Sequence, residues 1–278
     1  MNENGKIGLV LSGGSLTGIV AHTAVLAVID ELKIDIDYLV GTSAGAIVGG
    51  LYCNGISPYY FLNILKELRK KDVVSFSLKK FWKFGTIFNN KKLRRLIENE
   101  LRTNTGWSLL EPKFACVAVN LSKGIKEVLK GGCKLSDAML ASAAIPFVFE
   151  PVKIGNDYYC DAGGISNVPI KEAMTTFPDI KTLIISTFFD WDVSDNVYNS
   201  SNPFSGNIFT KAFNVLNRYL KAGARELLAL QSEDIMQIER IINIDLHSVY
   251  RLGLFNFKDI PITFQQAKAI AFGSLENF

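Results

Sequence analysis

Residues 39–45 read Leu-Val-Gly-Thr-Ser-Ala-Gly, and the rest of the chain is best interpreted outward from them. An apolar run ends at Gly41 and a small, apolar stretch begins at Ala46, so the segment predicts a strand, a sharp turn and a helix, with the pattern Gly-x-Ser-x-Gly at the turn. Side chains two residues before or after the serine would collide in so tight a turn, which explains the two glycines. The pattern predicts that Ser43 holds its hydroxyl clear of the sheet at the start of a helix, where free N–H groups favour negative charge.

The serine pattern is weak evidence by itself, because short motifs arise by chance and a lone serine before a helix is more often an N-cap than a nucleophile. The preceding sequence supplies context. Residues 6–12 predict a buried strand and residues 19–32 a helix, with Gly13-Gly14-Ser15 between them. This loop is not the dinucleotide fingerprint, whose second glycine is Ser15 here, nor the P-loop, because Ile19 replaces its lysine. Two interpretations remain: close packing of strand against helix, or a backbone oxyanion hole.

Composition limits the class of protein. The 278 residues are 48% hydrophobic, which is enough for one sizeable core. The cysteines are scattered without a Cys-x-x-Cys pair, so we expect reduced thiols and no metal site. They are Cys53, Cys116, Cys133 and Cys160. No apolar run is long enough to span a bilayer, and no basic-then-apolar leader opens the chain, so we expect a soluble, cytoplasmic protein.

Positive charge is concentrated in residues 66–95. This stretch has eleven lysines and arginines against two acidic residues, so it carries a charge of +9, whereas the whole chain carries only +3. Aromatic residues such as Phe76 and Trp82 are interleaved with these charges. The stretch is either a solvated helix face with a few core aromatics or a peripheral contact with an anionic membrane surface. The charge alone also fits nucleic acid, but no recognition motif accompanies it, so we expect no nucleic-acid binding.

Strands and helices are predicted to alternate along the chain. Further strands are expected at 113–121, 157–160, 181–187 and 241–246, with 125–129 pairing with the first of these. Further helices are expected at 59–71, 90–102, 135–145, 169–177, 207–237 and 263–275. Residues 72–90 have no clean period and predict an irregular lid or cap, and residues 188–206 predict a long surface loop. The alternation predicts an α/β fold: one three-layer domain whose mostly parallel central sheet is flanked by helices.

Four short motifs follow one another in the sequence. They are the glycine pair at 13–14, the turn at 41–45, Ala141-Ser-Ala-Ala-Ile-Pro-Phe-Val-Phe-Glu-Pro151, and Asp161-Ala-Gly after a predicted strand. In order and wording they resemble the patatin-like phospholipases, over roughly residues 5–190 and more weakly over 255–273. The resemblance implies one patatin-like hydrolase domain over 1–278. Its parts would be a core at 5–190, a lid- or cap-like segment at 66–105 and a C-terminal helical completion at 207–278.

The resemblance also implies roles for single residues. Ser43 matches the nucleophile, Asp161 matches its partner in a catalytic dyad, and the oxyanion loop matches Gly13, Gly14 and Ser15. Two departures affect that loop. Its third glycine is Ser15, which can still offer its N–H if its φ is negative, and the basic residue usually found next but two is Thr17. Loss of that positive charge leaves the rate and the substrate head group open.

The chemistry of the residues agrees with a dyad, because a serine nucleophile needs a base within hydrogen-bond reach. His22 lies one turn into the first predicted helix and is expected to be packed, and His247 follows the last predicted strand and is expected to be structural or exposed. Asp161 is the remaining candidate. A free aspartate is a poor base at neutral pH, but burial at the bottom of a cleft would raise its pKa. Taken alone, Asp161-Ala-Gly-Gly would be an ordinary turn.

The sequence therefore predicts a serine hydrolase of lipid acyl esters, similar to phospholipase A, that needs no metal and no cofactor. Two alternatives stay open. The first is a carboxylesterase or thioesterase for short acyl chains, and the second is a catalytically inactive patatin-like protein that binds lipid or a partner. The change of rate with acyl chain length separates the first alternative, and the reactivity of Ser43 toward a fluorophosphonate separates the second.

Overall fold

A computed structural model of the chain describes residues 5–76, 85–188, 238–253 and 255–278. The helix predicted over 207–237 and nearly all of the loop predicted over 188–206 lie outside these residues. The predicted division of the chain into a core, a cap and a C-terminal completion stays a prediction.

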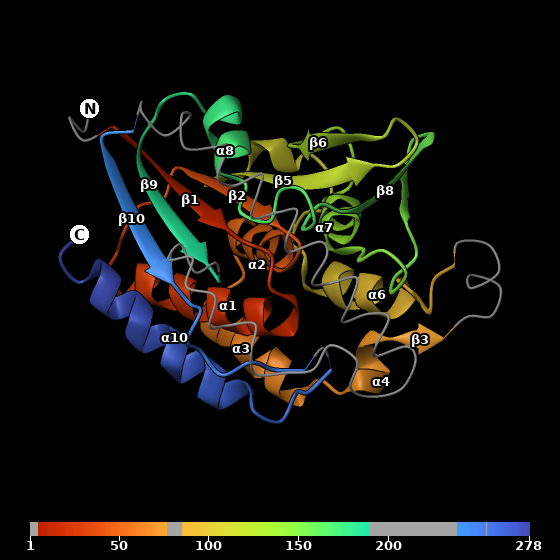
Figure 1. Ribbon diagram of the computed structural model, residues 1–278, viewed down its shortest axis with the longest axis horizontal. Coiled ribbons are helices and arrows are strands. Elements are labelled where there is room, and N and C mark those ends of the chain that lie inside the picture. The colour runs from red at the N-terminus through yellow and green to blue at the C-terminus, as the bar shows by residue number, and fades with distance from the viewer. Residues whose placement is uncertain (1–4, 77–84, 189–237, 254) are drawn as a thin grey trace, which may run out of the picture.

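Eight of the described strands build one sheet (Figure 1). Their order is β10 (Arg240–Asp245), β9 (Ile180–Thr187), β1 (Lys6–Leu11), β2 (Tyr38–Thr42), β5 (Lys113–Asn120), β8 (Asp157–Asp161) and β7 (Val152–Ile154), with β6 (Ile125–Leu129) also paired to β5. The five strands from β10 to β5 are parallel, whereas β6 and β8 run antiparallel to β5, and β7 runs antiparallel to β8. The predictions of a mostly parallel sheet and of the β5–β6 pair are confirmed.

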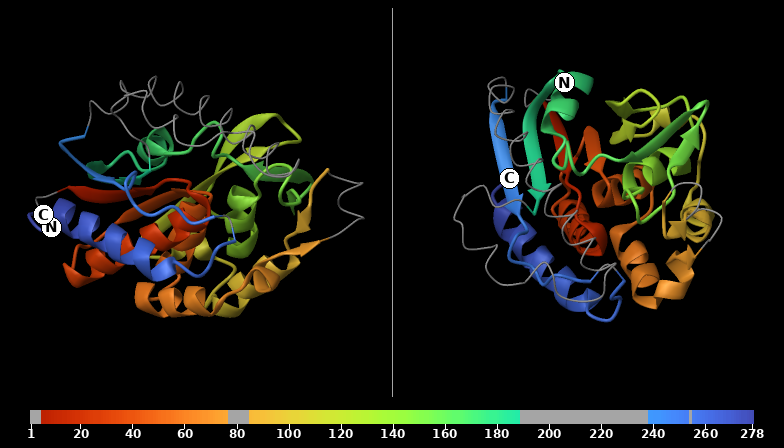
Figure 2. Two further views of the ribbon diagram at one scale, coloured as in Figure 1. Left: turned by 60° about the horizontal axis from the view of Figure 1, so that its bottom comes forward. Right: turned by 45° about the vertical axis from the view of Figure 1, so that its right-hand side comes forward.

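Helices cover both faces of the sheet, which confirms the predicted three-layer α/β fold (Figures 1 and 2). One face carries α1 (Ser15–Glu31), α2 (Ala44–Cys53), α3 (Pro58–Glu67), α7 (Leu135–Ala143) and α10 (Ile260–Leu275), and α8 (Ile170–Thr176) packs on the other. Strand β1 serves both cores because successive side chains of a strand alternate between faces. Leu9 and Leu11 belong to the larger core, and Val10 belongs to the core that contains Ile170.

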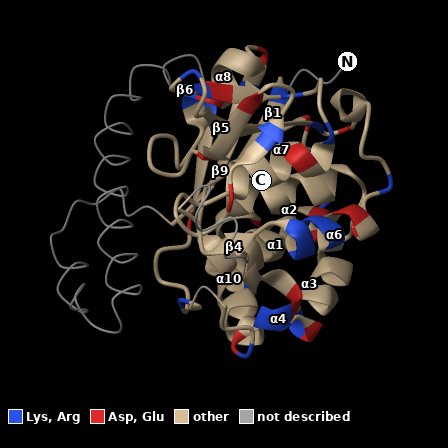
Figure 3. Cartoon of the chain, turned by 90° about the vertical axis from the view of Figure 1, so that its right-hand side faces the viewer, with Lys and Arg blue, Asp and Glu red and all other residues tan. Residues whose placement is uncertain are grey.

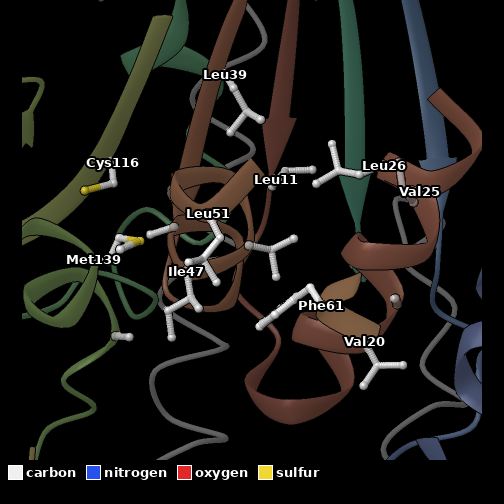
Figure 4. Packing of buried hydrophobic residues seen from close by; sticks show 14 of the residues in the cluster. Leu11, Val20, Val25, Leu26, Leu39, Ile47, Leu51, Phe61, Cys116 and Met139 are labelled. Carbon is white, nitrogen blue, oxygen red and sulfur yellow. The ribbon is translucent and has the colours of Figure 1, made fainter. Parts of the chain in front are cut away.

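The larger core surrounds α1, which is buried at nearly every position from Leu16 to Ile29. A helix that is apolar on all sides is stable only inside a protein, and α1 lies between the sheet and its neighbouring helices. Figure 4 shows Leu11 and Leu39 of the sheet and Leu51 of α2 among these packed side chains. Each such side chain contributes on the order of 2 kcal/mol when fully buried. This packing holds the two strand-to-helix turns, after β1 and after β2, next to each other.

The predicted helix over 59–71 is wrong, because the chain breaks it in two. Helix α3 ends at Glu67, Leu68 adopts an extended ψ of 144°, and the short α4 (Lys70–Val73) follows. The side chain of Asp72 accepts a hydrogen bond from the Arg69 N–H at 3.0 Å, so it caps the new start. The described part of the predicted cap continues with β3 (Ser75–Phe76), β4 (Phe88–Asn89) and α6 (Lys91–Glu100). Strands β3 and β4 pair with each other as a small separate sheet.

Other details differ from the predictions, among them the start of one helix and the presence of one short strand. Helix α1 begins at Ser15, four residues before the predicted start, because Gly18 already donates a helical hydrogen bond to Gly14. Strand β7 was not predicted, since it has only three residues and joins β8 through a tight turn. None of the described helices is long and apolar enough to cross a membrane.

Candidate active site

Ser43 stands in a strained turn between β2 and α2. Its φ is 54° and its ψ is −112°, a conformation that a non-glycine residue adopts only when the surrounding structure imposes it. The two flanking glycines allow this turn. A Cβ on Gly41 would overlap the main chain of Gly45, and a Cβ on Gly45 would overlap the carbonyl oxygen of Leu11 at the end of β1. The steric role predicted for these glycines is therefore confirmed.

The pairing of β5 brings Asp161 to Ser43. Val117 of β5 pairs with Thr42, the last residue of β2, and the next residue, Ala118, pairs with Asp161, the last residue of β8. Both partners lie along the same edge of β5, because β6 occupies its other edge. Strand β8 runs opposite to β2, so the two strands meet end to end and Asp161 adjoins the residue that follows Thr42. Two side chains 118 positions apart in sequence are thus adjacent in the fold.

Asp161 is half-buried, and its carboxyl group is hydrogen bonded. It accepts a hydrogen bond from the Gly163 N–H at 2.6 Å, and the Ser43 side chain is also hydrogen bonded to it. Burial raises the pKa of Asp161 to about 6, because it disfavours the charged form, although the two hydrogen bonds partly oppose this shift. At neutral pH the group is mostly ionised and still a better proton acceptor than an ordinary aspartate. The direction of this shift is the one expected from the sequence.

Ser142 of α7 was not recognised from the sequence as part of the site. Its hydroxyl accepts a hydrogen bond from the Ser43 N–H at 2.9 Å and donates one to the Val117 carbonyl at 2.6 Å. The side chain is fully buried. Ser142 therefore satisfies the main chain of the strained residue and ties it to the point of β5 where β2 and β8 meet. The only sequence signal was its position in the motif that starts at Ala141.

The loop at 13–15 differs from the expectation in two ways. The Gly13 N–H donates to the carbonyl of Asn167 at 2.9 Å, so this donor is already used, whereas no acceptor among the described residues takes the N–H of Gly14 or Ser15. The φ of Ser15 is 52°, so the condition of a negative φ is not met. The chain must turn from β1 into α1 directly after Gly14, and Ser15 adopts the left-handed region at a cost of roughly 1–2 kcal/mol. Gly13 packs close to the Asn167 side chain and the Cβ of Ser43.

Thr17, where a basic residue was expected, has a structural role. Its hydroxyl accepts a hydrogen bond from the Leu252 N–H at 2.9 Å and donates to the Leu252 carbonyl at 3.3 Å. The side chain is buried. Thr17 therefore fastens the segment after β10 to the first turn of α1.

Neither histidine can act as the base for Ser43. His22 is buried, with Nε2 2.8 Å from the Ser12 carbonyl oxygen and Nδ1 2.9 Å from the Ser186 hydroxyl, and burial lowers its pKa to about 4. The Ser12 carbonyl also accepts from the Gly45 N–H at 3.2 Å, so His22 supports the turn rather than the chemistry. His247 is exposed and pairs with Asp245 at 2.6 Å. The predicted packing of His22 is confirmed.

An apolar cavity of about 120 Å³ extends from Ser43. Its walls come from α1, α2, α3, α4, α6 and the segments around Phe149 and Phe255. Ser15, Ser43 and Ala44 are among the lining residues, and Glu100 is the one charged residue in the lining that the structure describes. Within the described residues, no group of histidine, cysteine, aspartate or glutamate side chains could hold a metal ion.

The model of the patatin-like phospholipase family matches residues 9–174, which is more than half of the chain. The chain belongs to the patatin-like phospholipase family. The matched range contains the loop at 13–15, Ser43, Ser142 and Asp161, so the resemblance drawn from the sequence motifs is confirmed.

Two curated proteins align with part of this chain. "Probable lipid hydrolase 463L" of Invertebrate iridescent virus 6 is 26% identical over 193 residues, which is 60% of this chain and 62% of the viral protein. "Lysophospholipase NTE1" of Eremothecium gossypii is 27% identical over 214 residues, 72% of this chain but 14% of that protein. The solved structure of VipD from Legionella pneumophila aligns with a TM-score of 0.41 at 13% identity, covering 98% of this chain and 67% of VipD. The chain thus spans less than two thirds of the viral and fungal relatives.

Proposed function

We propose that this patatin-like chain is a serine hydrolase of lipid acyl esters, with phospholipase A or lysophospholipase activity. The observation that carries the proposal is the Ser43–Asp161 pair, hydrogen bonded in a site where Ser43 opens onto an apolar cavity. Family membership and the names of the viral lipid hydrolase and the fungal lysophospholipase support the same substrate class. No step of the proposed chemistry requires a cofactor.

In the proposed mechanism, Asp161 accepts the proton of the Ser43 hydroxyl as its oxygen attacks the ester carbonyl carbon. The N–H of Gly14 stabilises the oxyanion, and such a donor contributes about 10²–10³ in kcat. Ser15 is not assigned to this role, because its φ is positive. The Gly13 N–H is engaged by Asn167, so Gly13 serves as the close-packed start of the loop. Protonated Asp161 then gives its proton to the leaving alcohol. Water, deprotonated by Asp161, hydrolyses the acyl-enzyme and regenerates Ser43.

The cavity predicts a preference for longer acyl chains. Each methylene group that leaves water contributes about 0.8 kcal/mol, so four more carbons gain on the order of tenfold to a hundredfold in kcat/KM if the chain enters the cavity. We expect kcat/KM for para-nitrophenyl esters to rise by at least about tenfold from butyrate to octanoate. Kinetics on the ester series measure this. A flat or falling series would favour the short-chain esterase and contradict the lipid substrate.

A catalytically inactive lipid-binding protein is the second candidate, because Ser15 has a positive φ and Thr17 carries no charge. A fluorophosphonate probe distinguishes the two functions, since it reacts only with an activated serine. The proposed hydrolase is modified at Ser43, and the Ser43→Ala variant is not. Absence of labelling in the wild-type chain would favour the binding protein.

We further propose that the cap contacts an anionic membrane surface. Lys70, Lys71, Lys91 and Arg95 are exposed on α4 and α6, which Figure 3 shows on one side of the molecule. Phe76 and Phe147 are also exposed. Phe76 pairs with Phe88 of β4, and the residue before it, Ile87, donates its N–H to the Phe147 carbonyl at 3.2 Å, so the two exposed rings belong to neighbouring segments. Cations near anionic head groups contribute about 1 kcal/mol each, and aromatic side chains favour the interface.

The double variant Lys91→Glu/Arg95→Glu tests this contact. We expect its partitioning onto vesicles with 30% phosphatidylserine to fall by about tenfold or more, because two attractive charges become repulsive. Co-sedimentation measures the partitioning. Lys113→Glu/Lys153→Glu is the matched control, since both lysines are exposed and lie away from the cap. Equal binding of all forms, or binding that does not depend on the phosphatidylserine content of the vesicles, would contradict the contact. The predicted cytoplasmic location stays a prediction.

A further inference from the structure

The apolar cavity follows α2, the helix that begins directly after Ser43. Ala44, Ile47 and Leu51 line it, and their spacing of three and four residues places them on one face of that helix. Because a helix rises about 1.5 Å per residue, the segment from Ser43 to Leu51 spans roughly 12 Å. An extended acyl chain advances roughly 1.3 Å per carbon, since its single bonds of about 1.5 Å form a zigzag, so Leu51 lies at the depth of about the ninth or tenth carbon.

Leu51 and Phe61 stand at the far end of the cavity from Ser43. They are the lining residues of α2 and α3 that are nearest in sequence to the connection between these helices, residues 54–57. Both side chains are buried, and Figure 4 shows that of Phe61 extending toward α2. The flank beside Phe61 is closed by polar groups, because Tyr60 is hydrogen bonded to Glu100. An acyl chain that follows α2 from Ser43 therefore ends against Leu51 and Phe61.

A second, smaller cavity lies behind these two side chains. Its volume is about 10 Å³, and Leu51 and Phe61 line both cavities. The two other side chains in its lining that carry a polar group are Thr23 and Tyr52, and their hydroxyls already donate to a main-chain carbonyl at 2.6 Å and to a carboxylate at 2.7 Å. A cavity of this size with no free polar partner suits hydrocarbon better than water. Leu51 and Phe61 thus form a barrier between two apolar spaces.

We propose that this barrier sets the acyl chain length of the substrate, so that kcat/KM rises up to about ten carbons and no further. Each methylene group that the cavity encloses raises kcat/KM roughly two- to fourfold, because it leaves water. A methylene group beyond the barrier must stay in water or displace a packed side chain, so it adds nothing. This inference rests on the proposed hydrolase function and adds to it a preference for acyl chains of medium length.

Three leucine-to-alanine variants separate the barrier from the other walls. Leu51 lines both cavities, whereas Leu65 lines the acyl cavity and Leu26 lines the smaller one, and all three are buried. Leu51→Ala removes on the order of three carbons from the barrier and joins the two spaces. Leu65→Ala and Leu26→Ala are the matched controls, because they remove the same group without opening the barrier.

Kinetics on para-nitrophenyl esters from butyrate to palmitate measure the limit. The ratio of kcat/KM for myristate to that for decanoate should not exceed about two in the wild type and in both controls. In Leu51→Ala we expect this ratio to be at least about fivefold higher than in the wild type. The ratio compares two substrates of the same variant, so it does not depend on how much of that variant is folded.

A larger side chain nearer to Ser43 should move the limit in the opposite direction. Ile47 lies one helical turn before Leu51 and roughly 6 Å along α2 from Ser43, so Ile47→Phe fills the cavity at about half its depth. We expect the ratio of kcat/KM for octanoate to that for butyrate to fall by about fivefold or more. This variant keeps the inference testable even if Leu51→Ala fails to fold.

A wild-type rate that continues to rise through palmitate would overturn the inference, and so would an equal shift in Leu51→Ala and Leu26→Ala. Binding decides the matter separately from turnover. In equilibrium dialysis of free fatty acids with Ser43→Ala as the parent, affinity should rise up to decanoate and then level off, and adding Leu51→Ala should extend the rise to myristate. Binding without this limit also overturns the inference. If the wild-type chain hydrolyses none of the esters, the hydrolase function fails, and the dialysis still decides the role of the barrier.

Discussion

Asp161→Asn is expected to lower kcat for acyl-ester hydrolysis by at least about a thousandfold while the chain stays folded. The amide has nearly the same shape and can still receive the Gly163 N–H on its oxygen, but it cannot accept the proton of Ser43. No other base replaces it, because His22 is buried and bonded elsewhere. Kinetics on para-nitrophenyl octanoate measure the loss, and Asp157→Asn at the other end of β8 should leave kcat unchanged.

The same variant should be more stable than the wild type at high pH. The pKa of Asp161 is raised from 3.8 to about 6 in the folded chain, so folding is favoured by the protonated form. This contribution is fully present below the unfolded pKa and is lost as pH rises through about 6, at a cost on the order of 2–3 kcal/mol. Urea unfolding should therefore show the variant more stable at pH 8, with the difference shrinking toward pH 4.

The pH dependence of the wild-type enzyme follows from the same group. The base must be ionised, so kcat/KM should rise as pH increases through about 6 and then level off.

Near-wild-type activity in Asp161→Asn would show that another group takes the proton. If Asp161→Asn is inactive but no more stable than the wild type at pH 8, Asp161 still has its catalytic role, but its buried charge does not destabilise the folded chain.

Sequence reasoning located the elements of this site because each lies in a short local pattern. The glycines around Ser43 and the strand before Asp161 follow from local sterics and hydrophobic runs, and both were predicted correctly. What brings them together is the register of β5, in which Val117 and Ala118 pair with different strands. Such long-range pairing depends on the packed sheet, and no local pattern encodes it.

The residues that sequence reasoning missed act through long-range contacts. Ser142 supports Ser43 from 99 positions away, and Thr17 holds a segment 235 positions away. A serine in a helix of small residues and a threonine in a first helical turn are common, so neither residue type indicates its partner. The break after α3 was missed for a related reason: the apolar pattern continues through Leu68, where the main chain becomes extended, and the Asp72 side chain then caps the start of a new helix.

Gly45→Ala is expected to have the second largest effect, on both stability and rate. A Cβ on Gly45 would overlap the Leu11 carbonyl oxygen and lie 2.7 Å from the Leu11 Cβ. Main-chain atoms of a central strand cannot rotate away, so α2 must move off β1 and carry Ser43 with it. We expect a loss of about 2–4 kcal/mol in the free energy of unfolding and about a hundredfold in kcat/KM.

Gly273→Ala in α10 is the matched control, because no atom lies within 4 Å of a Cβ built there. Alanine favours a helix over glycine, so this variant should be neutral or up to about 1 kcal/mol more stable, with unchanged kinetics. Urea unfolding and ester kinetics on both variants separate a specific clash from a general effect of adding a methyl group. If Gly45→Ala matched the wild type in stability and rate, α2 would have room to shift without moving Ser43. The close contact between β1 and α2 would then not be what fixes the nucleophile, and its strained backbone would have to be maintained by the Ser142 hydrogen bonds alone.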